Sequence, residues 1–220
     1  MISQINIEQA RFNMIEQQIR PWEVLDQRVL DVMTRTPRED FAPSRYRNLA
    51  FADVAIPLGH GQVMMRPNVE GRLLQALNPQ SADTILEVGT GSGYLTACLA
   101  GLGGRVVSVD IFPEFTAAAE HKLNAHGIDN VTLYSGDAAQ GWGDYRYDVI
   151  ALTGSLPVLP ERWRQQLVIG GRLFVIIGQD PIMEALLITR LGEQEWTEES
   201  LFETQLPPLL NVEKPGRFEF

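Results

Sequence analysis

The sequence contains one cysteine, Cys98, among its 220 residues. A single cysteine cannot form a disulfide within the chain, and it cannot supply the clustered thiolates of a structural zinc or iron–sulfur centre. Cys98 stands in an apolar, helix-like run, so we expect it to be a small buried side chain rather than a nucleophile. We expect no metal site.

The chain also lacks an excess of basic residues. Lys and Arg number 18 against 28 Asp and Glu, which gives a net charge of −10. A globally basic surface for nucleic acid is therefore absent. No apolar run approaches the roughly 18 residues of a membrane span, and residues 1–8 lack the pattern of a signal peptide. We expect a cytoplasmic enzyme with neither a nucleic-acid nor a membrane partner, either monomeric or dimeric.

The N-terminal part of the sequence predicts helices and an irregular segment. Residues 4–34 show a broken helical periodicity that is interrupted at Pro21. Residues 51–67 are punctuated by Gly and Pro and predict a loop. Helical spacing returns at Val69 and ends before Pro79. These features predict a helical appendage before the remainder of the chain.

From residue 84 onward, strand-like and helix-like runs alternate, which is typical of an α/β domain with a mostly parallel sheet. The expected strands are 84–88, 105–109, 131–134, 147–152 and 171–177. The expected helices are 94–100, 113–126 and 160–167. The last two strand-like runs, 183–190 and 199–206, have no helix between them and predict an antiparallel edge pair.

A glycine-rich turn connects the first of these strands to a helix. It contains Glu87, Val88, Gly89, Thr90, Gly91, Ser92 and Gly93. Glycines at such a turn allow the backbone to approach a nucleotide-like cofactor closely. The dinucleotide fingerprint has its third glycine one residue later, where Tyr94 stands. The turn alone is therefore a weak signal.

Two acidic residues strengthen this signal because they follow the next two strands. Asp110 comes 19 residues after Gly91, where a carboxylate can accept both ribose hydroxyls and would repel a 2′-phosphate. Gly136 and Asp137 follow the strand 131–134, where a carboxylate can accept from the adenine amine. Ligands of open α/β sheets bind at the carboxyl ends of the strands. The three features together predict a pocket for an adenosine that carries a small charged tail.

The combination of the glycine turn with acids after the next two strands resembles class I S-adenosylmethionine-dependent methyltransferases. This resemblance implies S-adenosyl-L-methionine as cofactor and S-adenosyl-L-homocysteine as product. The cofactor-binding candidates are Glu87, Gly89, Thr90, Gly91, Ser92, Gly93, Asp110, Ile111, Gly136, Asp137 and Ala138. Thr153 and Ser155 are candidates on the acceptor side, because the acceptor normally enters beside the strand 147–152. That loop lacks the Asn/Asp-Pro-Pro-aromatic motif of amino-directed nucleic-acid enzymes.

A closer resemblance lies upstream, in Ile56-Pro57-Leu58-Gly59-His60-Gly61-Gln62 followed by Pro67. This segment is similar to the signature loop of protein-L-isoaspartate O-methyltransferases. Further pieces match in order along nearly the whole chain, including Pro37-Arg38-Glu39-Asp40-Phe41 and Gly170-Gly171-Arg172-Leu173. The resemblance implies a Rossmann-like class I methyltransferase fold over 1–220. Residues 1–78 would form the N-terminal appendage and substrate loop, and 79–220 the cofactor-binding core.

The family's chemistry needs little from the protein beyond positioning. An isoaspartyl carboxylate is ionised at pH 7 and can attack the sulfonium methyl without a general base. His60 is therefore expected to hold the loop rather than to act as a base. The substrate-loop candidates are His60, Gly61, Gln62, Val63, Met65 and Arg66.

The chain departs from the family at the acceptor side. After Gly61-Gln62 the family carries Thr-x-Ser, and this chain has Val63-Met64-Met65. A second, milder departure is Ala138, where Gly is usual. In one interpretation Val63 and Met65 fill core space and Arg66 binds the carboxylate through a charge-assisted bond.

Three functions stay open at this point. The first is methylation of isoaspartyl residues in damaged proteins or peptides. The second is methylation of a different, unidentified acceptor, which the loss of both hydroxyls at Val63 and Met65 favours. The third is cofactor binding without turnover.

Overall fold

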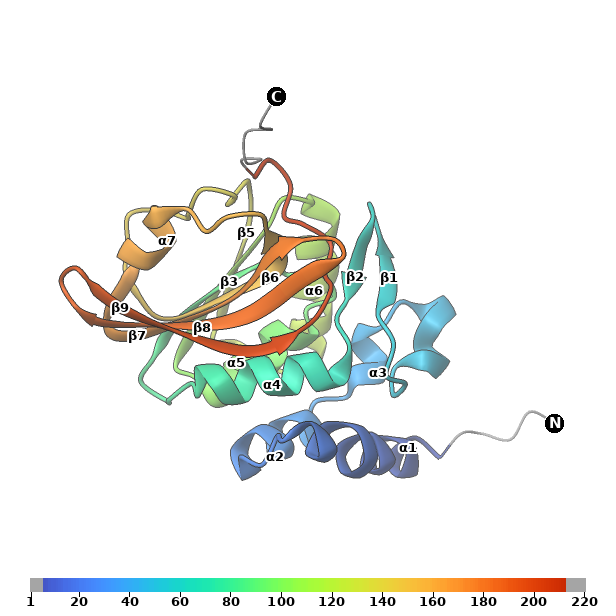
Figure 1. The fold of residues 1–220 in the computed structure, drawn as a ribbon. Helices are drawn as coiled ribbons and strands as arrows, with labels where there is room; N and C mark the ends of the chain where they lie inside the picture. The colour runs from blue at the N-terminus through green and yellow to red at the C-terminus, as the bar shows by residue number, and fades with distance from the viewer. Residues whose placement is uncertain (1–5, 213–220) are drawn as a thin grey trace.

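A seven-stranded sheet lies at the centre of the structure, a computed structural model that describes residues 6–212 (Figure 1). The strands of this sheet are β3 (Thr84–Val88), β4 (Arg105–Asp110), β5 (Val131–Ser135), β6 (Tyr147–Leu156), β7 (Leu167–Gln179), β8 (Ile182–Gly192) and β9 (Glu195–Glu203). The α-helices are α1 (Ile7–Met14), α2 (Gln27–Arg35), α3 (Arg38–Phe41), α4 (Pro67–Leu77), α5 (Tyr94–Leu102), α6 (Pro113–Ala125) and α7 (Glu161–Gln165). The predicted α/β class is confirmed.

The strand order across the sheet is β5-β4-β3-β6-β7-β8-β9. Strands β3 to β7 run parallel, and β8 and β9 add to the edge in antiparallel fashion. The mostly parallel sheet with an antiparallel C-terminal edge is thus confirmed. The chain moves outward from β3 to β5 and then returns to β6 on the other side of β3. This reversal is the point where open α/β sheets bind ligands.

Both faces of the central strands β3, β4, β6 and β7 are largely buried, which explains why these strands are rich in apolar residues. Alternate residues belong to different apolar clusters: Ile85 and Val106 lie on one face, Leu86 and Val109 on the other. Helix α4 contacts β6 and β7, α5 contacts β4, and α6 contacts β4 and β5. The apolar cluster on the face of the sheet that these helices cover also includes residues of the N-terminal helices. On the opposite face, α7 contributes the fully buried Trp163.

The N-terminal helices confirm the predicted helical appendage, and the helix is interrupted near Pro21 as expected. Helix α1 continues into a π-helical turn (Ile15–Ile19) and a 3-10 turn (Arg20–Trp22) that contains Pro21. The chain then reverses at Glu23, whose φ is 62°, and Asp26 caps α2 by accepting from the N–H of Arg28 at 2.8 Å. Residues 4 and 5, which the predicted helix included, lie outside the described range. A second 3-10 helix, Ser44–Leu49, follows α3.

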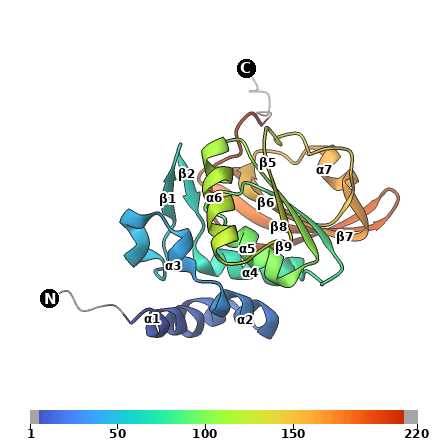
Figure 2. The same ribbon diagram turned by 180° about the vertical axis from the view of Figure 1, so that it is seen from behind.

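The segment 51–67 is not only a loop, as its glycines and prolines had predicted. It contains a small antiparallel hairpin, β1 (Ile56–Gly59) and β2 (Gln62–Met64), with an irregular register between Pro57 and Gly59. The hairpin stands beside α6 in both views (Figures 1 and 2). Such short strands carry too few residues for an alternating pattern to be recognised.

Other element boundaries also differ from the expected ones. Strand β6 continues past residue 152 to Leu156, after a register irregularity between Ala151 and Ser155. Helix α7 ends at Gln165, earlier than expected, because Leu167 already begins β7. Strand β9 spans Glu195–Glu203 instead of 199–206.

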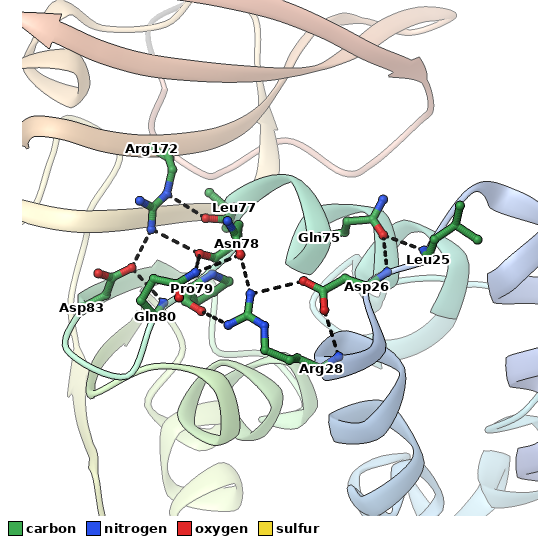
Figure 3. A network of polar contacts seen from close by, with 10 residues as sticks. All are labelled: Leu25, Asp26, Arg28, Gln75, Leu77, Asn78, Pro79, Gln80, Asp83 and Arg172. Atoms are coloured by element: carbon green, nitrogen blue, oxygen red, sulfur yellow. Dashed lines mark hydrogen bonds and ion pairs between the residues drawn. The ribbon is translucent and has the colours of Figure 1, made fainter.

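Polar side chains fasten the N-terminal helices to the C-terminal end of α4 (Figure 3). The side-chain oxygen of Gln75 accepts from the backbone N–H groups of Leu25 and Asp26, at 2.6 and 2.9 Å. Arg28 of α2 donates to the carbonyl of Pro79 at 3.0 Å and to the side-chain oxygen of Asn78. The loop before α2 is thereby fixed to α4 and to the residues that follow it.

Arg172 of β7 holds the same helix end from the side of the sheet (Figure 3). It donates to the carbonyl of Leu77 at 2.7 Å and to the carboxylate of Asp83 at 2.5 Å. Asn78 ends α4 in the left-handed region, at φ 45°. The C-terminal end of α4 is therefore hydrogen-bonded both to the N-terminal helices and to the sheet.

Candidate active site

A cleft opens at the carboxyl ends of β3, β4 and β6, where the strand order reverses. Its empty volume is about 590 Å³, including the open mouth. Ten of the candidate residues line it: Gln62, Val63, Gly89, Gly91, Asp110, Ile111, Gly136, Asp137, Ala138 and Thr153. The structure thus brings together residues from the hairpin, the glycine turn and the ends of three strands.

The glycine turn has a backbone that other residues would distort. Gly89, Gly91 and Gly93 all have positive φ angles, of 98°, 51° and 83°. A Cβ on Gly89 would lie 2.1 Å from Oγ1 of Thr153, and a Cβ on Gly93 would lie 2.9 Å from Cβ of Ala119. The Thr153 hydroxyl itself donates to the carbonyl of Gly89 at 2.8 Å. Close approach of neighbouring groups, together with the left-handed backbone, explains the glycines.

Asp110 supports this turn from the end of β4. One carboxylate oxygen accepts from the N–H of Gly91 and the other from the N–H of Phe112, each at 2.9 Å. Burial raises the pKa of Asp110, and these backbone hydrogen bonds counter that rise. A carboxylate has about four acceptor sites, so two remain for ligand hydroxyls. Asp110 lines the cleft and connects the turn to the start of α6.

Asp137 lies on the same side of the cleft, after β5. Its Oδ1 accepts from the N–H of Ala139 at 2.9 Å, and the preceding Gly136 donates its N–H to the carbonyl of Asp110 at 2.9 Å. Ala138, the mild departure from the family pattern, lines the cleft while only 5% exposed. The second acid is therefore held by its own turn and joined through Gly136 to the first.

Glu87 lies beneath the turn and does not line the cleft. Its Oε2 accepts from the hydroxyls of Thr96 at 2.5 Å and Ser108 at 2.6 Å, and the side chain is fully buried. Burial raises its pKa to about 8. The Ser108 hydroxyl also contacts the hydroxyl of Thr90 at 2.6 Å. Glu87 and Thr90 thus support the turn from inside, and Ser92 and Gly93 likewise lie outside the lining.

The β1–β2 hairpin covers the cleft from the side of α6. Leu58 lies 3.1 Å from the position of a Cβ on Gly91. At the hairpin tip, His60 stacks on the ring of Phe112 with centroids 4.2 Å apart, and its Nε2 lies 2.5 Å from Oε1 of Glu114. The neighbouring Gly61 is exposed and lies outside the lining. These contacts join the hairpin tip to Phe112 and to the first turn of α6.

The departures Val63 and Met65 differ in their access to the cleft. Val63 lines the cleft and also packs against the main apolar cluster, whereas Met65 is 5% exposed, belongs to that cluster and does not line the cleft. The carbonyl of Met65 accepts from Arg38 at 2.6 Å. Arg66 is exposed at the start of α4 and does not line the cleft. The loss of the first hydroxyl therefore changes the cleft wall, and the second replacement fills the core.

Ser155 has a role that the sequence did not indicate. It is 1% exposed, and its hydroxyl donates to the carbonyl of Leu206 at 2.8 Å. It thereby attaches the segment after β9, from which Leu209 and Leu210 line the cleft. Sequence reasoning missed these leucines. The rigid pair Pro207-Pro208 before them was the available signal, because it favours an extended segment.

The remaining unpredicted lining residues are mainly apolar. They are Leu58, Val88, Val109, Phe112, Phe115, Ala139 and Gly154. Among residues 6–212, Asp110 and Asp137 are the titratable side chains that line the cleft. Within this range no cluster of three or more His, Cys, Asp or Glu could hold a metal ion. No helix among these residues is long and apolar enough to span a bilayer.

Comparison with known proteins gives the family. The sequence model of the family described as "Protein-L-isoaspartate(D-aspartate) O-methyltransferase (PCMT)" matches residues 9–214. The chain belongs to this family. Relatives named "Protein-L-isoaspartate O-methyltransferase" include one from Rhodopseudomonas palustris, 37% identical over 202 residues, which covers 91% of this chain and 93% of the relative. Another, from Aeropyrum pernix, is 36% identical and covers 92% of this chain and 80% of the relative.

Solved structures of PCMT proteins share the fold. A putative protein-L-isoaspartate O-methyltransferase from Plasmodium falciparum, in complex with S-adenosyl-L-homocysteine, matches with a TM-score of 0.76 at 19% identity. The match covers 93% of this chain and 98% of that one. This similarity confirms the predicted class I methyltransferase fold, and the PCMT membership confirms the family inferred from the signature loop.

Proposed function

We propose that this chain is an S-adenosylmethionine-dependent O-methyltransferase that methylates the carboxylate of isoaspartyl residues in proteins or peptides. Its membership of the PCMT family supports the reaction. The observation that carries the proposal is the cleft itself, where the glycine turn, Asp110 and Asp137 lie together with residues of the β1–β2 hairpin, which contains the signature loop. The proposal assigns cofactor binding to the first three and acceptor binding to the hairpin side.

The cofactor side of the cleft fits an adenosine with an amino-acid tail. The free acceptor sites of Asp110 suit the two ribose hydroxyls, and Asp137 suits the adenine amine. Gly89 and Gly91 let the backbone approach the tail, at positions where a side chain would meet Thr153 or Leu58.

The acceptor side is formed by Gln62, Val63 and Thr153 together with Leu209 and Leu210. S-adenosylmethionine supplies an electrophilic methyl group when bound. An isoaspartyl carboxylate arrives ionised at pH 7, so the protein has no proton to remove from it. The protein's contribution is then to exclude water and to align two bound partners, which can lower a barrier substantially. A mostly apolar wall suits this role.

Val63 favours a second candidate, a methyltransferase of the same family with a different acceptor. Val63 lines the cleft where the family has a Thr hydroxyl. A bound carboxylate that lost one hydroxyl partner would lose about 1 kcal/mol of binding free energy. An apolar acid would lose less, because the methyl groups of Val63 could contact it.

The test is methyl transfer from labelled S-adenosylmethionine to a peptide with one isoaspartyl residue, beside the same peptide with a normal aspartyl residue. We expect incorporation into the isoaspartyl peptide alone. Equal background incorporation into both would overturn the proposal. Transfer to small apolar carboxylic acids, with none to either peptide, would establish the second candidate.

A substitution of Val63 tests whether the acceptor binds beside this residue. Val63→Thr should lower the KM for the isoaspartyl peptide about five- to tenfold, consistent with one regained hydrogen bond. The matched control is Val158→Thr, because Val158 is 60% exposed and does not line the cleft. An equal effect of both variants on KM would contradict the assignment of Val63 to the acceptor wall.

A further inference from the structure

The segment that follows β9 crosses the cleft and is anchored to the end of β6. The N–H of Ser155 donates to the carbonyl of Pro207, and the N–H of Leu209 donates to the carbonyl of Ser155, each at 3.0 Å. Leu209 also contacts Gly154, where a Cβ would lie 2.6 Å from its side chain. In both views this end of the described chain lies at the same edge of the molecule as the hairpin tip (Figures 1 and 2).

Beyond the two leucines, the segment reaches the second acid of the cleft. Nδ2 of Asn211 donates to Oδ2 of Asp137 at 2.7 Å. Since Ala139 already donates to Oδ1, each oxygen of Asp137 has one protein partner. The two residues are 74 positions apart in sequence, so the contact depends on the path of the whole segment.

We propose that Asn211 is a positioning residue of the cofactor site, which orients the Asp137 carboxylate toward the adenine amine. This inference rests on the proposed function, since it concerns the same cofactor. The end torsion of an exposed Asp side chain is broad and lets the carboxylate rotate. A donor on Oδ2 together with one on Oδ1 fixes the carboxylate plane before the ligand arrives, so less freedom is lost on binding.

The side chain at 211 is suited to this role in two ways. Its backbone has φ 60°, a left-handed conformation that Asn tolerates better than most residues. Its amide donates to an acid without adding a charge to the site. Asn211 does not block the ligand, because Asp137 keeps about two acceptor sites after the two protein contacts.

The variants follow from this geometry. Asn211→Gly removes the amide while tolerating the left-handed backbone. Asn211→Asp keeps the shape and places a second carboxylate against Asp137. The control is Gln205→Ala, because the Gln205 amide donates to the carboxylate of Asp180 at 2.9 Å, in the same segment but outside the cleft lining.

The measurement is calorimetric titration with S-adenosylhomocysteine and with S-inosylhomocysteine, in which a carbonyl replaces the adenine amine. We expect Asn211→Gly to bind S-adenosylhomocysteine about fivefold more weakly and Asn211→Asp at least about tenfold more weakly. Affinity for the inosine analogue should change much less, so the preference for adenine should fall. Gln205→Ala should keep both affinities, and the melting temperatures of the free proteins should stay close together.

Three results would overturn the inference. Unchanged or tighter binding of S-adenosylhomocysteine by Asn211→Gly would show that the amide does not assist Asp137. An equal loss for both ligands would show a general effect on the segment instead of an effect on the adenine amine. No binding by the unaltered chain would overturn the proposed cofactor and this inference together, whereas missing transfer to isoaspartyl peptide with intact binding would affect only the acceptor.

Discussion

The buried ion pair of Arg38 and Glu70 should make a large contribution to the stability of this fold. Arg38 is fully buried and Glu70 is 2% exposed. The guanidinium pairs with Glu70, donates to the carbonyls of Ala50 at 2.8 Å and Met65 at 2.6 Å, and lies over the Tyr94 ring. One side chain thus connects the 3-10 helix at 44–49, the end of the hairpin, α4 and α5.

Arg38→Met should lower the free energy of unfolding by about 3–5 kcal/mol, because it leaves the Glu70 carboxyl buried without its partner. The lost bonds to two carbonyls belong to the same network, so their loss does not add in full. The double change Arg38→Met and Glu70→Leu should be more stable than Arg38→Met by about 1 kcal/mol or more, because it removes the stranded acid.

The loss should also depend on pH. Burial raises the pKa of Glu70, and Arg38 opposes that rise. Without Arg38 the folded-state pKa rises further above the unfolded value, so the folded state of Arg38→Met binds this proton more tightly. The contribution of Glu70 to the stability of this variant is then greatest at low pH and falls as pH increases. We expect the deficit of Arg38→Met to be larger at about pH 8 than at about pH 5.

Urea unfolding followed by circular dichroism measures these differences. The control is Arg47→Met, because Arg47 pairs with Asp40 in a site where the side chains are 52% and 33% exposed. Its loss should stay below about 1 kcal/mol. The reasoning would be refuted if Arg38→Met destabilised the protein no more than Arg47→Met, or if the double variant were no more stable than Arg38→Met.

Three further changes test the floor of the cleft. Asp110→Asn should weaken S-adenosylhomocysteine binding about 10- to 100-fold in titration calorimetry, because it removes charge-assisted bonds, and unchanged affinity would contradict the role of Asp110. The pKa of Glu87 is raised from 4.5 to about 8, so its contribution is complete below about pH 4.5 and is lost as pH rises toward 8. In Glu87→Gln the unfolding free energy should therefore fall by about 2–4 kcal/mol less between those pH values than in the unaltered chain. The same pH dependence for both proteins, measured by urea unfolding at each pH, would argue against this role of Glu87. Gly89→Ala should lower the melting temperature more than Gly170→Ala, because both glycines have positive φ but only Gly89 has Thr153 within 2.1 Å of the added Cβ; equal shifts would contradict the steric argument.

Local patterns predicted the parts of the site that depend on nearby residues. Strand, glycine turn and helix are adjacent in sequence, and the acids after β4 and β5 share the edge where parallel strands end. The position of Glu87 could also have been inferred, because side chains alternate along a strand. Glu87 shares the face of Ile85, which packs toward the helices, while Leu86 and Val88 belong to the other cluster.

Contacts between distant segments could not be predicted in this way. Leu209 and Leu210 line the cleft and Asn211 contacts Asp137. These positions depend on the hydrogen bonds of Ser155 to Leu206, Pro207 and Leu209, and no local periodicity in the sequence indicates that pairing. The positions of Val63 and Met65 could not be predicted from their spacing either. Two residues apart, they would lie on one face of a continuous strand, but β2 ends at Met64 and Met65 lies in the core.

Two segments that are far apart in sequence contribute lining residues to the cleft, the hairpin at residues 56–64 and the pair Leu209 and Leu210 after β9. During synthesis the N-terminal segments emerge first, at about 5–20 residues per second. The hairpin, the glycine turn and Asp110 leave the ribosome well before Leu209 and Leu210, which also line the cleft. The lining of the cleft is therefore complete only after residue 210 has been made, and a ligand that binds earlier in synthesis would lack its contacts with these two leucines.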